Sequence, residues 1–191
     1  MTARAVDFHG FPDLDDEVLA LRVQDDFEAF AELYRRYLSP LYRFVRSQVP
    51  DEATAEDLTA QVFFKALSSA STFRNEGSYQ SWLFRIAHNA IVSWRSSKTN
   101  GLIIMDRVPD SVDPDPSPVA KAITDEESSL VRQKVEELPP AQREVVALRY
   151  LQDFSIEEIA KVTRRTRGAV RILLHRARSR LRRDLEGKEA T

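Results

Sequence analysis

Apolar residues recur every three or four positions along most of this chain, a spacing typical of helices that bury one face. No stretch alternates apolar and polar residues for long enough to predict a β-strand. The first clear helical stripe consists of Phe27, Phe30, Ala31, Tyr34, Tyr37, Leu38 and Leu41. Because proline disrupts a helix interior but suits a first turn, Ser39-Pro40 predicts a break and a second helix that runs to Val49.

Two further helices are predicted before residue 98. Thr54 and Asp57 form a T-x-x-D start signal for the first helix. We expect this helix to bury Leu58, Val62, Ala66 and Leu67. A loop over residues 73–80, which contains Asn75 and Gly77, precedes a helix over residues 81–97. The expected inward face of that helix is Leu83, Ile86, Ala87, Ala90 and Ile91.

The composition changes after residue 98. Residues 99–122 contain Gly101, four prolines and four aspartates. Since prolines end helices and like charges repel one another, this stretch predicts an extended, flexible linker. The apolar run at residues 102–105 (LIIM) would be out of place in a free linker, so it indicates a docking segment.

Helical spacing returns over residues 119–138, and the signals that start and end helices are strong after it. Pro139-Pro140 ends that segment, and Pro140 suits the start of the next helix. Ser155 and Glu158 form a capping box that opens a short helix. The inward face of the short helix is predicted to be Ile156, Ile159, Ala160 and Val162. Residues 164–166 then make a tight turn before a long helix.

These patterns predict an all-α protein with two small helical domains joined by a flexible linker. We place an acidic N-terminal arm at residues 1–19, the first domain at 20–98, the linker at 99–122 and the second domain at 123–187. Residues 1–26 carry a net charge of −5, and the sequence leaves open whether they fold fully.

Charge is concentrated in one short segment. Residues 161–183 contain ten basic side chains and no acidic one, while the whole chain carries −2, so the remainder sums to −12. A basic segment on an acidic protein indicates a polyanionic partner, above all nucleic acid. Apolar residues at helical spacing run through the segment, so we expect a packed helix with a basic face. They are Val170, Leu173, Leu174, Ala177 and Leu181.

A short capped helix, a tight turn and a second helix that begins with small residues form the pattern of a helix-turn-helix. Its second helix would enter the major groove and read bases with its early outward residues. Arg171, His175 and Arg178 lie on one face of it, and arginine suits bidentate contact with guanine. We expect Arg164, Arg165, Arg167 and the C-terminal arginines to hold phosphates.

Several classes of protein are excluded or disfavoured. No apolar run approaches the roughly 20 residues of a membrane span, and residues 1–10 lack the apolar core of a secretory signal. There is no cysteine, and His9, His88 and His175 lack metal-ligand spacing, so we expect no metal site. No nucleophile motif, carboxylate pair or phosphate-binding glycine loop is visible. We therefore expect no catalytic residue and no cofactor.

Three segments resemble the extracytoplasmic-function group of bacterial RNA polymerase sigma factors. Residues 55–67 (AEDLTAQVFFKAL) are similar to the family's region 2 helix that docks on the polymerase, and residues 81–89 (SWLFRIAHN) to its W-L-x-x-I-A-x-N signature. Residues 138–181, from LPPAQREV to RARSRL, resemble its region 4. The segments occur in the family's order and spacing, and the resemblance covers nearly all of residues 25–185.

The resemblance implies a sigma factor that binds core RNA polymerase and promoter DNA. For the −35 element it implies contacts from Arg164, Arg165, Arg167, Arg171, Ile172, His175, Arg176 and Arg178. For binding and melting the −10 element it implies Phe73, Arg74, Trp82, Arg85, His88, Asn89 and Trp94. For the polymerase interface it implies Asp57, Leu58, Gln61 and Phe64.

Two departures and one alternative qualify this interpretation. The docking helix has Ala60-Gln61 where the family usually has Gln-Glu. In the recognition helix, Ile172-Leu173 follow Arg171 where the family often has Ser-Arg, which predicts a different −35 preference. The resemblance also implies an anti-sigma partner between the domains. The alternative is a regulator whose helix-turn-helix binds operators as a dimer, and it leaves the segment Trp82 to Asn89 without a purpose.

Overall fold

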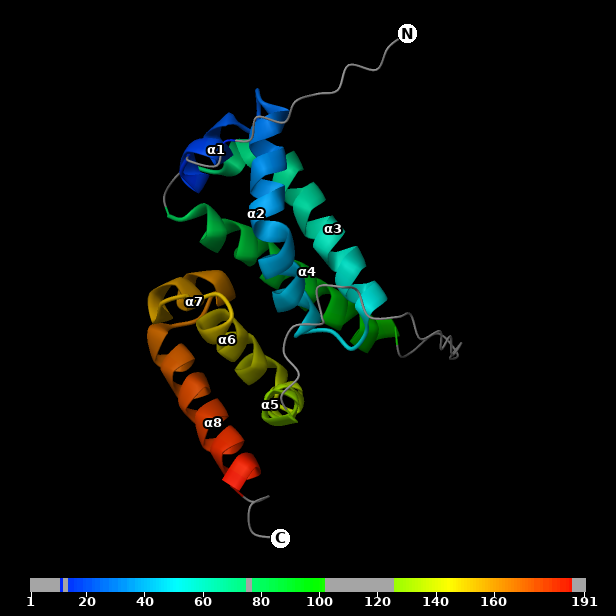
Figure 1. Ribbon diagram of the computed structural model, residues 1–191, viewed down its shortest axis with the longest axis vertical. Helices are drawn as coiled ribbons and strands as arrows, with labels where there is room; N and C mark the ends of the chain where they lie inside the picture. Colours follow the sequence, from blue (N-terminus) through cyan, green and yellow to red (C-terminus); the bar gives the residue numbers. More distant parts are fainter. Residues whose placement is uncertain (1–10, 12–13, 75–76, 102–125, 187–191) are drawn as a thin grey trace. The chain divides into compact units, whose positions relative to one another are not determined.

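The computed structural model describes residues 11, 14–74, 77–101 and 126–186. Within these residues all regular structure is helical, which confirms the predicted all-α fold (Figure 1). The elements are α1 (Asp16–Arg22), α2 (Phe27–Arg46), α3 (Glu52–Ser68), the 3₁₀ turn η1 (Ala70–Thr72), α4 (Tyr79–Gly101), α5 (Glu126–Glu136), α6 (Pro140–Tyr150), α7 (Ile156–Thr163) and α8 (Arg167–Glu186).

The described residues fall into two compact units. The first unit takes those of residues 1–91 and 161–164, and the second takes those of 92–160 and 165–191. The predicted linker over 99–122 begins inside α4, which ends at Gly101. Its remainder, including the apolar run at 102–105, lies outside the described residues, so the linker and the four predicted domain boundaries stay predictions.

Helix α2 lies at the centre of the first unit and packs against both α1 and α3 (Figure 1). It is one continuous helix with Pro40 inside it, so the predicted break at this proline is wrong. The apolar face continues through the proline, with Tyr37 on one side of it and Leu41 and Phe44 on the other, all buried. Burial of these large side chains outweighs the roughly 3 kcal/mol cost of proline in a helix.

Two helices of the first unit begin earlier than predicted. Helix α3 begins at Glu52, because Asp51 rather than Thr54 caps it, with the Thr54 N–H donating to Asp51 Oδ1 at 2.8 Å. Helix α4 begins at Tyr79, two residues before the predicted start. The expected inward residues Leu58, Val62, Ala66, Leu83, Ala87 and Ile91 are buried. Leu67 is 36% exposed, contrary to expectation.

A network of polar contacts fixes α1 against α2. Arg36 Nη1 donates to Leu14 O at 2.8 Å and to Asp16 Oδ1 at 2.6 Å, and Nη2 donates to Phe11 O at 2.7 Å. The Tyr37 hydroxyl donates a short hydrogen bond to Asp16. Helix α1 therefore starts within the stretch predicted to be an acidic arm, and its Leu19 is fully buried.

In the second unit, α6 and α5 both pack against α8. Helix α6 starts at Pro140 as predicted, and Ser155 and Glu158 form the predicted capping box ahead of α7. The Ser155 N–H donates to Glu158 Oε2 at 2.8 Å, and the Glu158 N–H donates to Ser155 Oγ at 3.2 Å. Val170, Leu174 and Ala177 of α8 are buried, so its apolar stripe packs inward.

Candidate nucleic-acid interface

A turn of three residues joins α7 to α8. Arg164 adopts the left-handed conformation with a φ of 53°, which bends the chain sharply at the end of α7. The Arg165 N–H donates a hydrogen bond to Ala160 O at 3.0 Å. Thr166 caps α8, because its Oγ1 accepts a hydrogen bond from the Ala169 N–H at 3.1 Å. These contacts give the local geometry of a helix-turn-helix, with α8 in the place of the recognition helix.

The eight residues implicated in −35 binding are all exposed. They are Arg164, Arg165, Arg167, Arg171, Ile172, His175, Arg176 and Arg178. At 100° per residue, Ile172 points almost directly away from the buried stripe of α8, and His175 points outward roughly 135° from the centre of the stripe. Arg171 lies on the same flank as His175, roughly 90° from the stripe. Ile172 is 54% exposed, an unusual position for a large apolar side chain unless something covers it.

Arg178 already has an intramolecular partner. Its Nε donates to the Tyr150 hydroxyl of α6 at 2.7 Å, and its guanidinium carbon lies 5.7 Å from the centre of the tyrosine ring. A cation over an aromatic face is stabilised by the ring quadrupole. Arg178 is therefore oriented by its contacts with Tyr150 of α6.

On the other flank of α8, sequence reasoning assigned Arg176 to the −35 element and the C-terminal arginines to phosphates, but it did not predict a groove between them. There, a groove of about 320 Å³ is lined by Gln142, His175, Arg176, Ser179, Arg180 and Arg183. Three arginines along one groove make a basic channel that suits a phosphate backbone. Their i, i+4 and i+7 spacing (176, 180, 183) is the sequence signal that could have identified it.

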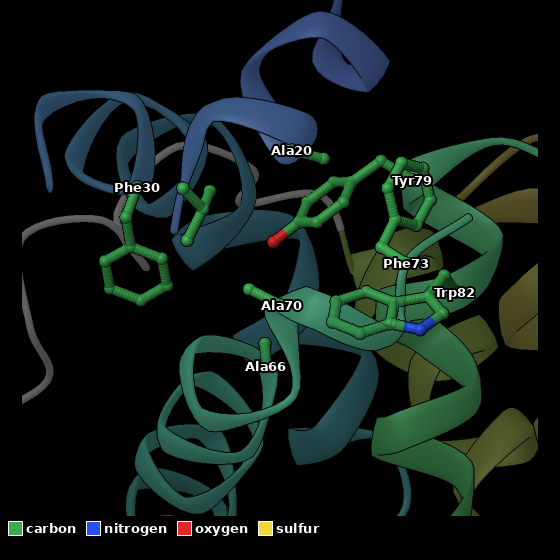
Figure 2. Close-up of a pocket in the computed structure, with 8 residues that line it drawn as sticks. Ala20, Phe30, Ala66, Ala70, Phe73, Tyr79 and Trp82 are labelled. Atoms are coloured by element: carbon green, nitrogen blue, oxygen red, sulfur yellow. The ribbon is translucent and has the colours of Figure 1, made fainter. Parts of the chain in front are cut away.

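In the first unit, three aromatic rings gather where α4 begins. The ring centres of Phe73 and Tyr79 are 5.8 Å apart, those of Phe73 and Trp82 5.7 Å, and those of Tyr79 and Trp82 5.6 Å. Figure 2 shows the three side chains beside a cavity of about 10 Å³, room for one water at most. Phe73 is 7% exposed, so it supports this cluster from the interior.

The other residues implicated in −10 melting divide between surface and interior. Trp82, Arg85 and Asn89 follow one another at i, i+3 and i+7, so they share a face of α4, and Arg85 and Asn89 are exposed. Arg74 is exposed as well. His88 is buried, and Trp94 falls roughly 120° around α4 from Trp82. The structure thus brings together Trp82, Arg85 and Asn89, and it sets His88 and Trp94 apart from them.

The four residues implicated in polymerase docking also divide. On α3, Asp57 and Gln61 are exposed and Phe64 is 74% exposed, whereas Leu58 is 4% exposed and belongs to the core. Sequence reasoning identified Phe64 but missed the other members of an exposed apolar set on α2 and α3. This set comprises Phe27, Tyr34, Leu38, Phe64 and Leu67.

The first three members of this set form a stripe along α2, because they are spaced i, i+7 and i+11. The ring of Tyr34 lies 4.6 Å from that of Phe63, which precedes Phe64 in α3. Exposed apolar side chains at this density indicate a protein-binding surface.

The described residues contain neither a candidate metal site nor a candidate membrane span. No group of three or more His, Cys, Asp or Glu side chains there could hold a metal ion. No helix in that part of the chain is both long and apolar enough to cross a membrane.

Comparisons with known proteins agree with this geometry. The family described as Sigma-70 region 2 matches residues 33–100, and Sigma-70, region 4 matches residues 128–181. SigX of Bacillus subtilis, an extracytoplasmic-function sigma factor, is 32% identical over 83% of this chain and 84% of its own length. BldN of Streptomyces coelicolor is 33% identical over 78% of this chain, which spans 58% of the longer BldN.

A solved structure shares the fold. Sigma factor RpoE from Bartonella quintana, determined in complex with the anti-sigma factor NepR, superimposes with a TM-score of 0.69 at 24% identity. The alignment covers 82% of this chain and 96% of RpoE. With SigX aligned over more than four fifths of both sequences, and with both sigma-70 regions in order, this chain belongs to the extracytoplasmic-function family of RNA polymerase sigma factors.

Proposed function

We propose that this protein is a promoter-specificity subunit, inactive alone, that binds core RNA polymerase and directs it to −35 and −10 elements. The observation that carries the proposal is the presence of both sigma-70 regions in one chain. The chain has no catalytic role in this proposal, needs no cofactor, and acts in the cytoplasm, where the polymerase is.

Run-off transcription tests the proposal. Purified core polymerase is incubated with genomic fragments, with and without the protein, and transcripts from discrete start sites are expected only with it. The operator-binding alternative predicts tight, sequence-specific binding of intact duplex by the free protein and no specific start sites. That result would replace the sigma-factor proposal.

We propose further that α8 reads the −35 element with Arg171, Ile172 and His175, while the arginine groove holds the phosphate backbone. Their exposure supports these roles, as does the direction in which Ile172 and His175 point. Ile172 suits contact with a thymine methyl group. Arg164, Arg165 and Arg167, at the turn and the first residue of α8, suit phosphates near the helix N-terminus.

Replacing Arg171 by alanine is expected to weaken transcription from promoters with one particular −35 base by about 1–3 kcal/mol, with polymerase binding unchanged. The measurement is run-off transcription across a set of single-base −35 variants. Arg180→Ala is the matched control, since a phosphate contact is expected to lower transcription equally at every variant. Equal loss across the set for Arg171→Ala would make Arg171 a phosphate contact as well.

We propose that the face of α4 formed by Trp82, Arg85 and Asn89 captures the melted −10 strand. An unstacked base needs a stacking surface and a hydrogen-bonding group, which an indole and a carboxamide supply. Phe73 and His88, being buried, would support this face from beneath, and Arg74 suits a phosphate.

Asn89→Ala is expected to slow strand opening by roughly 10-fold, the loss of one or two hydrogen bonds to a base, and to leave −35 binding unchanged. Permanganate reactivity of unpaired thymines in the complex with core polymerase measures the opening. Ser93→Ala, one turn further along α4 at an exposed position, is the matched control. Wild-type reactivity in Asn89→Ala would remove this residue from the melting site.

We also propose control by an anti-sigma factor, on the strength of the likeness to RpoE, whose structure includes NepR. An exposed apolar set on α2 and α3 supports this idea, because an inhibitor that covered it would exclude polymerase. A stoichiometric inhibitor is then expected to block both core binding and run-off transcription.

A further inference from the structure

The first turn of α4 is held by two side chains from very different places in the sequence. The Ser81 N–H donates to Ser78 Oγ at 3.2 Å, a local cap. The Tyr79 N–H donates to Glu17 Oε1 at 3.0 Å, across 62 residues. First-turn N–H groups have no partner within their own helix, and the helix dipole favours a negative charge beside them. Glu17 of α1 is thus a long-range cap of α4.

Helix α1 has only seven residues, too few to be stable alone, so its position depends on its contacts. Asp16, directly before Glu17, accepts from Arg36 at 2.6 Å and from the Tyr37 hydroxyl. Burial, with the hydrogen bond to Asp16, raises the pKa of Tyr37 well above its usual value, so its phenol stays protonated as a donor. These contacts fix the carboxylate of Glu17 relative to α2.

The residue that Glu17 caps is the centre of the aromatic cluster. The Tyr79 ring lies 5.4 Å from that of Tyr37, and it contacts Phe73 and Trp82. Ala20 of α1 lines the same cavity, as Figure 2 shows. Helix α1 therefore contacts the start of α4 through a hydrogen bond, and both helices contribute side chains to the lining of one apolar cavity.

We propose that Glu17 is a positioning residue for promoter opening, because it fixes the first turn of α4 and with it the face that carries Trp82 and Asn89. This inference rests on the proposed role of that face in capturing the −10 strand. Glu17 itself touches no DNA in the proposal. Its effect passes through the Tyr79 backbone.

The experiment compares three variants of the full chain, Glu17→Ala, Glu17→Gln and Asp15→Ala. Glutamine keeps an acceptor oxygen for the Tyr79 N–H, whereas alanine removes it. Asp15 is the matched control, since it is an exposed acid two residues before Glu17 whose side chain makes no cap hydrogen bond. Amide hydrogen exchange at Tyr79 by NMR reports the cap. Permanganate reactivity with core polymerase, on a promoter found by run-off transcription, reports opening.

Glu17→Ala is expected to accelerate exchange at Tyr79 and to lower opening, each about fivefold, the usual effect of losing one cap. Core binding and −35 duplex binding are expected to be unchanged. Glu17→Gln and Asp15→Ala are expected to behave like the wild type in both measurements, which a general loss of stability in α1 would not produce.

Two results would overturn the inference, and a third would overturn the function beneath it. Unchanged exchange at Tyr79 in Glu17→Ala would show that the cap does not hold α4. Faster exchange with normal opening, while Asn89→Ala remains defective, would make Glu17 a structural residue only. Normal opening in Asn89→Ala and Trp82→Ala as well would instead reject the role of α4 in strand capture.

Discussion

Replacing Arg36 by alanine is expected to lower the free energy of unfolding of the first unit by about 3 kcal/mol, the usual effect of breaking a buried ion pair. The hydrogen bonds of Arg36 include those it donates to Phe11 O, Leu14 O, Asp16 and Glu32. The side chain of Arg36 is 25% exposed and that of Glu32 only 6%, so removing the guanidinium leaves the buried Glu32 paired only with Arg35, whose side chain is 52% exposed.

The charge of Arg36 is secure in the folded state. Burial alone lowers its pKa, but hydrogen bonds to Glu32 and Asp16 more than offset that effect, and the net shift is upward. The guanidinium therefore stays protonated at every pH used for the measurement. Loss of stability in Arg36→Ala would then reflect the missing contacts and not a change in titration.

Urea unfolding followed by tryptophan emission checks this prediction, with Arg35→Ala as the matched control. Arg35 also pairs with Glu32, at 2.5 Å, but its side chain is 52% exposed. An exposed pair contributes about 0–1 kcal/mol. Equal losses in the two variants would show that the contacts of Arg36 with α1 and the segment before it contribute little to stability. Since α1 carries Glu17, Arg36→Ala is also expected to slow promoter opening.

Phe64→Glu is expected to weaken association with core polymerase on the order of 100-fold, the effect of losing a central aromatic anchor. Phe64 is 74% exposed on α3, and it belongs to the exposed apolar set of α2 and α3. A charge at its position would have to be desolvated when the partner binds. Stability is expected to change by no more than about 0.5 kcal/mol, since the side chain packs against little in the free protein.

Two other variants separate docking from folding. Leu58→Ala, in the same sequence motif but buried, is expected to cost about 2–5 kcal/mol of stability. Leu21→Glu changes an exposed apolar residue of α1 outside the exposed apolar set and is expected to leave polymerase binding intact. Binding is measured by fluorescence titration of labelled core. Wild-type affinity in Phe64→Glu would place the docking surface elsewhere.

The sequence predicted the helices after residue 138 more closely than those before residue 101. Three local signals were found where they were expected, because each affects only the backbone of its immediate neighbours. They are Pro140, the Ser155–Glu158 capping box and the turn at residues 164–166. In the first unit the local signals compete. Asp51 and Thr54 are both capping residues, and only the geometry of the fold selects Asp51.

In the candidate site, too, local features were predicted from the sequence and contacts between distant residues were not. Arg171, Ile172 and His175 could be proposed from helical periodicity alone, because the apolar stripe of α8 fixes which residues face outward. Periodicity did not predict the hydrogen bond between Arg178 and Tyr150, which lies 28 residues away in the sequence. Nor did it separate Leu58, which is buried, from Phe64, which is exposed, within one motif.

By itself the sequence determined the all-α class, the helix-turn-helix and the concentration of positive charge on α8, because periodicity, capping and charge are local properties. Only the tertiary structure decided that α2 continues through Pro40, that α1 belongs to the first unit and that Glu17 caps α4. Each of these depends on burial or on hydrogen bonds between segments far apart in the chain, whose free energy exceeds local preference and which no short window of sequence contains.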